Sequence, residues 1–395
     1  EFKTYSPEKQ ESIKDSLSYW SDATGIEFIE VNETLTNSYG DIRFFLMDFS
    51  SWENIDPFYE DTAGFAYLPS YVDYDDALMG DVFIDSFYTP GDGYFEHLLT
   101  HEIGHSIGLS HPFDGLVNID LKNYESIMGY DNNYFIASQP MPADIKAGEF
   151  LYGGNSSANI NDDTYSFNAE SDLIYRTSVI DKGGDDIFDF SQQLSGVFVN
   201  LEPDSWSSLD YPSDIENLTE DDWVYENGQI YISENSFIES VNGSDFNDII
   251  SDNSSNNTIN GWAGDDLINS NEGDDVIWGG EGNDTMFGGE GSDSYIYWYD
   301  GQDTIVDNGN YGIDTIILKA HLANEVQIWG ESYINEDGFL VLSGHPQNAP
   351  GSSLTADGIE SIFWITDDNR FEEYSVTIFN ADIHTINDED QFWYV

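Results

Sequence analysis

The segment from His101 to His111 holds residues that could bind a metal ion. His101 and His105 are four residues apart and would share one face of a helix. Gly108 can take a positive φ, which would end the helix and turn the chain so that His111 reaches the same point. Imidazoles at this spacing are zinc ligands, and three of them leave one zinc position open for water. The segment therefore predicts one catalytic Zn²⁺ bound by His101, His105 and His111.

Glu102 lies beside the first of these histidines and is not needed as a ligand. A zinc-bound water has its pKa lowered toward about 7, so a neighbouring carboxylate can take its proton. We therefore expect Glu102 to be the general base of a hydrolase. Its presence also argues against an inactive zinc site, which could most easily lose this residue. The histidines and Glu102 alone leave two alternatives open: a zinc hydrolase that does not act on peptides, and a helix with structural histidines.

The string Ser126-Ile127-Met128-Gly129-Tyr130 lies downstream of the zinc motif. It matches the methionine turn that follows such a motif in metzincin proteases. Met128 would form a soft apolar floor beneath the histidines. Tyr130 is predicted to be catalytic, with its phenol stabilising the oxyanion of a tetrahedral intermediate. This turn favours peptide hydrolysis over other zinc chemistry.

The first 150 residues mix helix and strand patterns, as a sheet-and-helix support for this motif would require. Ile13, Leu17 and Trp20 recur at helical spacing after Ser6-Pro7 and predict a helix from Pro7 to about Ala23. Alternating or continuous apolar runs predict strands at 26–31, 41–46, 63–68 and 80–85. Helical periodicity almost disappears after Asp162, so the rest of the chain is expected to be all β. The predicted fold class is α+β in two domains, 1–155 and 156–395.

A nine-residue repeat runs without a gap from Gly243 to Ile296. Each of the six units carries Asp or Asn at its sixth position and an apolar residue at its eighth. The repeat resembles the calcium-binding nonapeptide of RTX proteins, in which two units make one coil of a parallel β-roll. Stacked carboxylates repel one another unless a divalent cation lies between them. The alternative, an acidic low-complexity linker, would not keep both the acidic and the apolar residue at fixed positions in six units. The expected calcium ligands here are Asp248, Gly261, Gly264, Asp266, Gly273, Asp275, Gly279, Gly282, Asp284, Gly288, Gly291 and Asp293.

The charge and composition exclude several classes of function. Ten Lys and Arg stand against 77 Asp and Glu, and a net charge of −67 would repel nucleic acids and anionic lipids. No apolar run approaches the roughly 18–20 residues that span a bilayer, and we expect no membrane span. The chain has no Cys, so bound Ca²⁺ is expected to replace disulfides as the stabilising link.

Together, the zinc motif with His111-Pro112, the turn at 126–130 and the downstream repeat resemble the serralysin family of secreted bacterial zinc metalloproteases. The resemblance implies a metzincin-type α/β protease domain followed by an all-β calcium-binding β-roll and β-sandwich. It also implies that the segment 63–67 is an edge strand to which an extended substrate adds by backbone pairing. The expected substrates are extracellular or unfolded proteins and peptides, cleaved with broad side-chain preference.

The same resemblance implies calcium sites outside the repeat. The loop from Asp181 to Asp186 resembles one of them, although a Gly-rich acidic turn without a metal is the alternative. Carbonyl groups of Asn159, Asn161 and Asp163 are expected to contribute. The implied calcium ligands are Asp181, Gly183, Gly184, Asp186 and the distant Glu239.

The family resemblance finally implies export of a monomer by type I secretion machinery, which reads an uncleaved C-terminal signal. Residues 385–395 resemble that signal, with acidic residues before apolar ones, although a buried last strand is the alternative. The segment 297–390 departs from the family's usual tail. A rival function of another class is an RTX calcium-binding adhesin or matrix protein whose zinc site is inert or structural.

Overall fold

The computed structural model divides the chain into two compact units, Glu1–Asn253 and Ser254–Val395. The boundary predicted at residue 155 lies within the first unit and stays a prediction. No helix among the described residues is long and apolar enough to cross a bilayer. The structure describes residues 2–31, 41–51, 62–69, 78–91, 94–114, 121–122, 124–129, 136–168, 175–210, 228–298, 301–307, 309, 312–319, 329–334, 340–344, 353–357, 359, 361–365 and 371–372.

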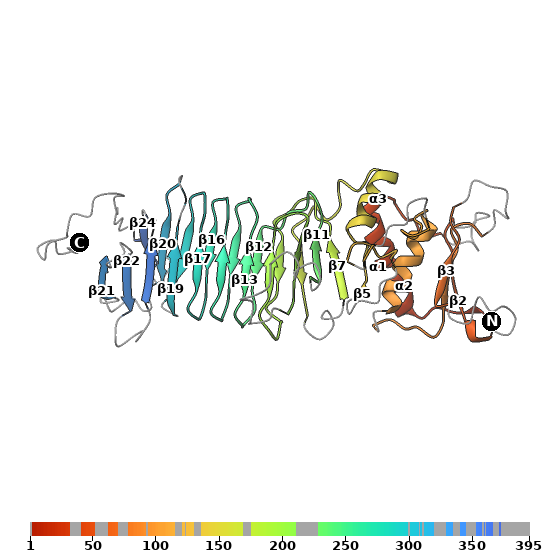
Figure 1. Ribbon diagram of the computed structural model, residues 1–395, viewed down its shortest axis with the longest axis horizontal. Coiled ribbons are helices and arrows are strands. Elements are labelled where there is room, and N and C mark those ends of the chain that lie inside the picture. Colours follow the sequence, from red (N-terminus) through yellow and green to blue (C-terminus); the bar gives the residue numbers. More distant parts are fainter. Residues whose placement is uncertain are drawn as a thin grey trace, which may run out of the picture. The chain divides into compact units, whose positions relative to one another are not determined.

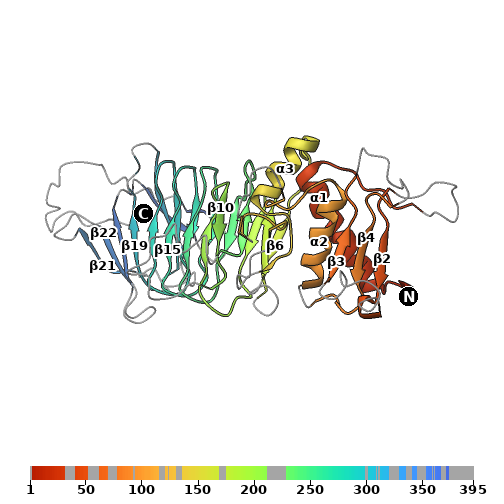
Figure 2. The same cartoon turned by 45° about the vertical axis from the view of Figure 1, so that its right-hand side comes forward.

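The first unit begins with a sheet in the order β1-β2-β4-β3, and α1 and α2 cover one of its faces (Figure 2). Strands β2 and β4 are parallel, whereas β3 runs antiparallel to β4. The elements are β1 (Phe2–Lys3), α1 (Pro7–Thr24), β2 (Phe44–Met47), the 3₁₀ turn η1 (Phe49–Ser51), β3 (Gly64–Ala66), β4 (Val82–Asp85), α2 (Tyr94–Ser106), β5 (Ile136–Ala137) and α3 (Pro142–Tyr152).

The sequence predicts α1 well because both of its ends carry local signals. The Ser6 hydroxyl accepts the Lys9 N–H at 3.3 Å, Pro7 opens the helix, and Gly25 ends it with φ 77°. Strands β2, β3 and β4 fall in three of the four predicted segments. The fourth prediction, a strand at 26–31, is wrong: this segment forms no strand, and Ile29 is 72% exposed. Its alternating pattern is local, but a strand also needs a neighbour to pair with.

Two apolar clusters hold α2 in place. Between the helices and the sheet, Leu98 and Leu99 of α2 pack with Ile13 of α1 and Val82 and Ile84 of β4. The second cluster joins the other end of α2 to α1, where the buried Trp20 donates its indole N–H to the Thr100 carbonyl at 2.8 Å. Burial on this scale fixes the helix that carries the predicted zinc motif.

The rest of the first unit is β structure, as predicted. One sheet has the order β10-β11-β7-β5, and two parallel sets follow: β6, β8 and β12, and β9 with β13. These strands are β6 (Thr164–Ser166), β7 (Tyr175–Val179), β8 (Ile187–Asp189), β9 (Phe198–Asn200), β10 (Ser205–Ser207), β11 (Ile230–Ile232), β12 (Ser240–Asn242) and β13 (Ile249–Ser251).

The second unit contains two stacks of mainly parallel strands, between which the chain alternates from β14 to β21 (Figure 1). One stack has the order β14-β16-β18-β20-β24-β25 and the other β15-β17-β19-β23-β22-β21. Ile259 pairs with Ile277, which is 18 residues or two repeat units further on, and both are buried. The strands are β14 (Thr258–Asn260), β15 (Leu267–Asn269), β16 (Val276–Trp278), β17 (Thr285–Phe287), β18 (Ser294–Tyr297), β19 (Gln302–Val306), β20 (Thr315–Lys319), β21 (Trp329–Ile334), β22 (Leu340–Gly344), β23 (Ser353–Asp357), β24 (Ser361–Ile365) and β25 (Phe371–Glu372).

Candidate functional site

Helix α2 presents His101 and His105 on one face and turns away directly after them. The Leu109 N–H donates to the Gly104 carbonyl at 2.9 Å, and Gly108 takes φ 104°. This positive φ is the one that the sequence predicts at Gly108, because a residue with a side chain would be strained there. The turn brings His111 back to the two helical histidines.

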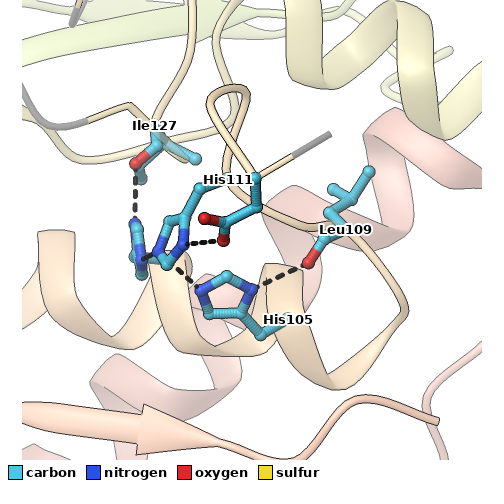
Figure 3. A network of polar contacts seen from close by, with 6 residues as sticks. His105, Leu109, His111 and Ile127 are labelled. Atoms are coloured by element: carbon cyan, nitrogen blue, oxygen red, sulfur yellow. Dashed lines mark hydrogen bonds and ion pairs between the residues drawn. The ribbon is translucent and has the colours of Figure 1, made fainter. Parts of the chain in front are cut away.

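The three histidines face one another through their Nε2 atoms (Figure 3). Each Nδ1 faces an acceptor instead: His101 faces the Ile127 carbonyl at 2.8 Å, and His105 faces the Leu109 carbonyl at 2.8 Å. Since a carbonyl cannot donate, both Nδ1 atoms must carry the proton. A neutral imidazole then has a bare lone pair on Nε2. The structure therefore points these lone pairs toward a common centre.

The spacing of the Nε2 atoms fits a tetrahedral zinc ion. The Nε2 of His111 lies 3.3 Å from that of His101 and 3.1 Å from that of His105. Two zinc–nitrogen bonds of about 2.0–2.1 Å at the tetrahedral angle would separate their nitrogens by about 3.3 Å. Lone pairs this close repel one another unless a cation lies between them. One histidine–carbonyl or histidine–carboxylate contact per ligand is also the usual support of a zinc site.

Burial keeps the helical histidines neutral in the metal-free protein. Burial lowers the pKa of His101 to about 3, against a weaker opposing effect of the Ile127 carbonyl. The pKa of His105 is lowered for the same reason. Neutral imidazole is the form that binds zinc, so this environment favours ligation over protonation.

Met128 lies directly under the helix that carries the ligands. A Cβ atom placed on Gly104 would be 2.6 Å from the Met128 sulfur and 2.9 Å from Cζ2 of Trp20. Glycine at this position therefore lets α2 approach the turn at 126–129 closely. Met128 is buried with Trp20 and Ile103 in one apolar cluster, and its predicted role as a floor beneath the histidines stays a prediction.

Asp144 of α3 holds this turn, a role that sequence reasoning missed. Its carboxylate accepts the Ser126 hydroxyl and the Ile127 N–H, both at 2.6 Å, and the Met141 N–H at 2.9 Å. Because the Ile127 carbonyl accepts from His101, Asp144 is linked to His101 through one residue. Burial raises the pKa of Asp144 to about 6, against the lowering effect of these hydrogen bonds.

Asp114 and His97 are two further supports that the motif did not reveal. The Asp114 carboxylate lies 2.7 Å from Nδ1 of His111 and orients its ring. His97, one helical turn before His101, places its Nδ1 2.7 Å from the Ala137 carbonyl and so ties α2 to β5. The contact between His97 and Ala137 joins residues far apart in the sequence, so only the fold reveals it. Asp114, by contrast, lies only three positions after His111.

Glu102 is buried next to His101 in the helix. It is 5% exposed, and its Oε2 has no hydrogen-bond partner among the described residues. Burial raises the pKa of Glu102 to about 8 in the metal-free protein. A nearby cation would lower this pKa again. The other residue predicted to be catalytic, Tyr130, lies outside the described residues.

The predicted calcium loop brings three carboxylates together. One oxygen each of Asp163, Asp181 and Asp186 lies within 4.8 Å of the others. The Glu239 carboxylate accepts the Asp186 N–H at 2.9 Å, so the distant partner predicted for this loop does reach it. Gly183 and Gly184 take φ 145° and 152°. Sequence reasoning expected only a carbonyl from Asp163, whereas its side chain also faces the cluster.

The repeat carboxylates of the second unit form two ladders. Asp275, Asp284 and Asp293 each accept the backbone N–H of the residue two units earlier, as in Asp284 with Asp266 at 2.9 Å and Asp293 with Asp275 at 2.9 Å. This arrangement agrees with the predicted division of sixth positions between two edges. The first-position glycines Gly261, Gly279 and Gly288 pack against the Asp of their own turn, where a Cβ would collide with its Oδ2. The fourth-position glycines Gly264, Gly273, Gly282 and Gly291 all have positive φ, from 127° to 153°.

Asp248, in the first unit, differs from the other predicted repeat ligands. Its oxygens accept the Val197 N–H at 2.8 Å, the Ser244 N–H at 2.6 Å and the Ser244 hydroxyl at 2.7 Å. These donors stabilise the carboxylate much as a cation would. The role of Asp248 as a calcium ligand, like those of the other predicted site residues, stays a prediction.

Comparison with known proteins gives two family matches. The model described as Matrixin matches residues 3–119, and the model described as RTX calcium-binding nonapeptide repeat (4 copies) matches residues 242–277 and 264–295. Serralysin B of Dickeya chrysanthemi is 30% identical over 277 residues, which cover 62% of this chain and 53% of that protein. Serralysin of Proteus mirabilis is 30% identical over 277 residues, which cover 61% of this chain and 53% of that protein.

A third relative, metallopeptidase AprA of Pseudomonas marginalis, is 31% identical over 289 residues, which cover 63% of this chain and 55% of that protein. The chain spans about half the length of the curated relatives it matches. Among solved structures, the AlgE6R3 subunit of the Azotobacter vinelandii mannuronan C5-epimerase matches with 20% identity and a TM-score of 0.24. That match covers 36% of this chain and 91% of the other, and its score is too low to support an inference.

Proposed function

Because the chain belongs to the serralysin family, we propose that it is a secreted zinc endopeptidase stabilised by calcium. The proposed reaction is hydrolysis of peptide bonds in extracellular or unfolded proteins. The observation that carries the proposal is the convergence of three Nε2 atoms at 3.1–3.3 Å, with two Nδ1 atoms held by carbonyls. His101, His105 and His111 would hold the zinc. When bound there, zinc supplies a Lewis acid that lowers the pKa of a water molecule.

Glu102 is the proposed general base. Its buried carboxylate precedes Ile103 on the helix that carries His101, and its unpartnered Oε2 is free to take a proton. In the proposed reaction Glu102 accepts the proton of the attacking water and then delivers it to the leaving amine nitrogen. Tyr130 donates a hydrogen bond from its phenol to the developing oxyanion.

Strand β3 is the proposed substrate-pairing strand. It is the last strand in the order β1-β2-β4-β3 and pairs with β4 through Phe65 and Phe83. Its residue Gly64 packs against Leu98 of α2, and Pro69, three residues after the strand, lies beside Gly108 at the end of the zinc motif. An extended peptide that adds to this edge would therefore pass close to the histidines.

Calcium is the proposed link that stabilises the β structure. Asp266, Asp275, Asp284 and Asp293 are buried acids in ladders, and their mutual repulsion would favour unfolding unless cations bind between them. We propose that Ca²⁺ held by these side chains and by glycine carbonyls closes a parallel β-roll. The loop with Asp181 and Asp186 would bind a further ion.

The remaining family properties complete the proposal. They are a catalytic domain at 1–155, a calcium-binding domain at 156–395, a monomeric state, and export by type I secretion machinery. The proposed signal near 385–395 lies outside the described residues.

Metal analysis joined to a proteolysis assay tests the proposal against the adhesin alternative. The wild-type protein, dialysed with zinc and calcium, should hold one zinc ion and cleave an unfolded protein such as reduced casein. His105→Ala should lose both zinc and cleavage, while the distant control Glu272→Gln should keep both. Stoichiometric zinc without cleavage would instead favour an inert site in a calcium-binding adhesin or matrix protein.

A further inference from the structure

The strand stacks continue past the nonapeptide repeats, with longer units. Asp303 accepts the Asp284 N–H at 3.1 Å, and Asp314 accepts the Asp293 N–H at 2.9 Å. These are the contacts that sixth-position residues make within the repeats. The partners are 19 and 21 residues apart instead of 18, so a strict nine-residue period misses them. Both aspartates also lie beyond the matched repeat segments, which end at residue 295.

Asp307, in the turn between β19 and β20, adds a carboxylate at a position where most repeat units have glycine. It is the residue after β19, the position that Gly288 holds after β17. Its carboxylate is buried, accepts the Tyr295 hydroxyl at 2.9 Å and accepts the Gly309 N–H at 2.9 Å. One oxygen each of Asp293, Asp307 and Asp314 lies within 4.8 Å of the others.

An independent observation points to a ligand at this cluster. The Asp293 side chain is 0% exposed, yet its Oδ2 has no hydrogen-bond partner among the described residues. A Cβ atom placed on Gly288 would lie 2.0 Å from the Tyr295 hydroxyl oxygen, 2.5 Å from that Asp293 oxygen and 2.8 Å from Oδ2 of Asp307. Both carboxylate oxygens therefore face the same point beside the Tyr295 hydroxyl, and only glycine leaves room for them there.

The chemistry of the cluster selects one class of ligand. Three carboxylates that share a buried volume repel one another strongly without a neutralising ion. Hard oxygen donors without imidazole or thiolate favour calcium over transition metals. Backbone carbonyls and water are further ligands that Ca²⁺ accepts to reach its coordination number of about 6–8.

We propose that Asp307 and Asp314, which lie beyond the nonapeptide repeats, join Asp293 of the last repeat unit in a calcium site with three carboxylates. It differs from the repeat sites because Asp307 adds a third carboxylate at a position that is glycine in most of the earlier turns. Affinity for calcium rises with the number of charged ligands, so this site should fill at lower calcium than the repeat sites. The inference extends the calcium binding proposed above for Asp293 and does not rest on catalysis.

Calcium titration of the metal-stripped 395-residue chain tests this site. Binding would be followed by calorimetry, and bound ions would be counted by native mass spectrometry. Asp307→Asn should bind one calcium ion fewer in the tightest class, or weaken that class by about tenfold or more. Glu290→Gln removes an exposed charge in the turn that carries Asp293 and should leave both the count and the affinity unchanged. An Asp307→Asn protein with the wild-type count and affinity would overturn the proposal.

A second variant covers the case in which Asp307→Asn does not fold. Asp307→Gly places at this position the residue that the earlier turn has at Gly288, and it removes the same carboxylate. A variant that is unfolded at low calcium should refold when calcium is raised about 10- to 100-fold, because its site is only weakened. A variant that stays unfolded at high calcium, while Glu290→Gln folds, would count against the site.

Asp284→Asn separates this proposal from the repeat sites. If Asp284→Asn loses a calcium ion and Asp307→Asn does not, calcium binding by the repeats stands and the additional site is wrong. If neither variant loses an ion, both the additional site and the calcium role proposed for Asp284 are wrong.

Discussion

Replacing Asp275 by Asn should change the stability of the protein in opposite directions with and without calcium. Asp275 is buried, its Oδ1 accepts the Asn257 N–H at 2.7 Å, and its Oδ2 has no hydrogen-bond partner among the described residues. An Asn side chain can keep the first contact through its amide oxygen. The substitution therefore removes a buried charge with little change in shape.

The pKa of Asp275 gives the size of the effect without calcium. Burial, with a smaller contribution from Asp293, raises this pKa from 3.8 to about 7. A raised carboxyl pKa means that the folded state holds the proton more tightly, so stability is full below about pH 4 and is lost as pH rises through about 7. A shift of about 3 units corresponds to at most about 4 kcal/mol at pH 8. Asp275→Asn removes this loss.

With calcium bound, the sign of the effect should reverse. The ionised carboxylate then binds the cation, and a site weakened about tenfold gives up about 1.4 kcal/mol of stabilisation at saturating calcium. One kcal/mol shifts the unfolding midpoint of a unit of this size by about 2–4 °C. We expect Asp275→Asn to raise the midpoint by about 5–10 °C in EGTA at pH 8 and to lower it by about 3–5 °C in calcium.

Circular dichroism melts of both proteins, in EGTA and in calcium at pH 5 and pH 8, measure this reversal. Glu272→Gln is the matched control, because it removes an exposed charge three residues before Asp275 and should shift neither midpoint. In EGTA the wild-type midpoint should fall between pH 5 and pH 8 more steeply than that of Asp275→Asn. A midpoint that moves in the same direction with and without calcium would refute the reasoning that Asp275 is a buried charge neutralised by Ca²⁺.

Three further predictions concern the supports of the zinc site. Gly104→Ala should destabilise by about 1–3 kcal/mol despite a helix-propensity gain of about 1 kcal/mol, because its Cβ would lie 2.6 Å from the Met128 sulfur; thermal melts should show Met128→Ala partly rescuing it. Asp144→Ala should cost about 3 kcal/mol by leaving the Ile127 and Met141 N–H groups unpaired, and Asp144→Asn less, with zinc loss to a chelator following the same order. Tyr130→Phe should lower kcat about 100-fold while zinc content and KM stay unchanged, and an unchanged kcat would remove Tyr130 from the mechanism.

The parts of the zinc site that the sequence predicts are those set by local spacing. His101 and His105 share a helix face because they are four residues apart, and Gly108 turns the chain because only glycine adopts its φ of 104° without strain. The support from Asp144 could not be predicted in this way. It acts across 17 and 18 residues of sequence, and only the folded arrangement of α3 and the turn reveals it.

The β structure shows the same distinction between periodic and non-periodic signals. The repeat predicts the aspartate ladders because strand partners 18 residues apart correspond to two units. Asp303, Asp307 and Asp314 escaped a strict nine-residue period because their turns are one to three residues longer. The strand wrongly predicted at 26–31 failed for the related reason that alternation along the chain does not supply a pairing partner.

Glu102 is proposed to activate water at a zinc ion held by three histidines. The most direct test of this role compares the wild-type protein and Glu102→Ala on an unfolded protein substrate in calcium buffer, with the zinc content of both measured. We expect full zinc in both proteins, and a turnover that falls by several orders of magnitude in the variant and is abolished in the wild type by a zinc chelator. Near-normal cleavage by zinc-loaded Glu102→Ala would contradict this role.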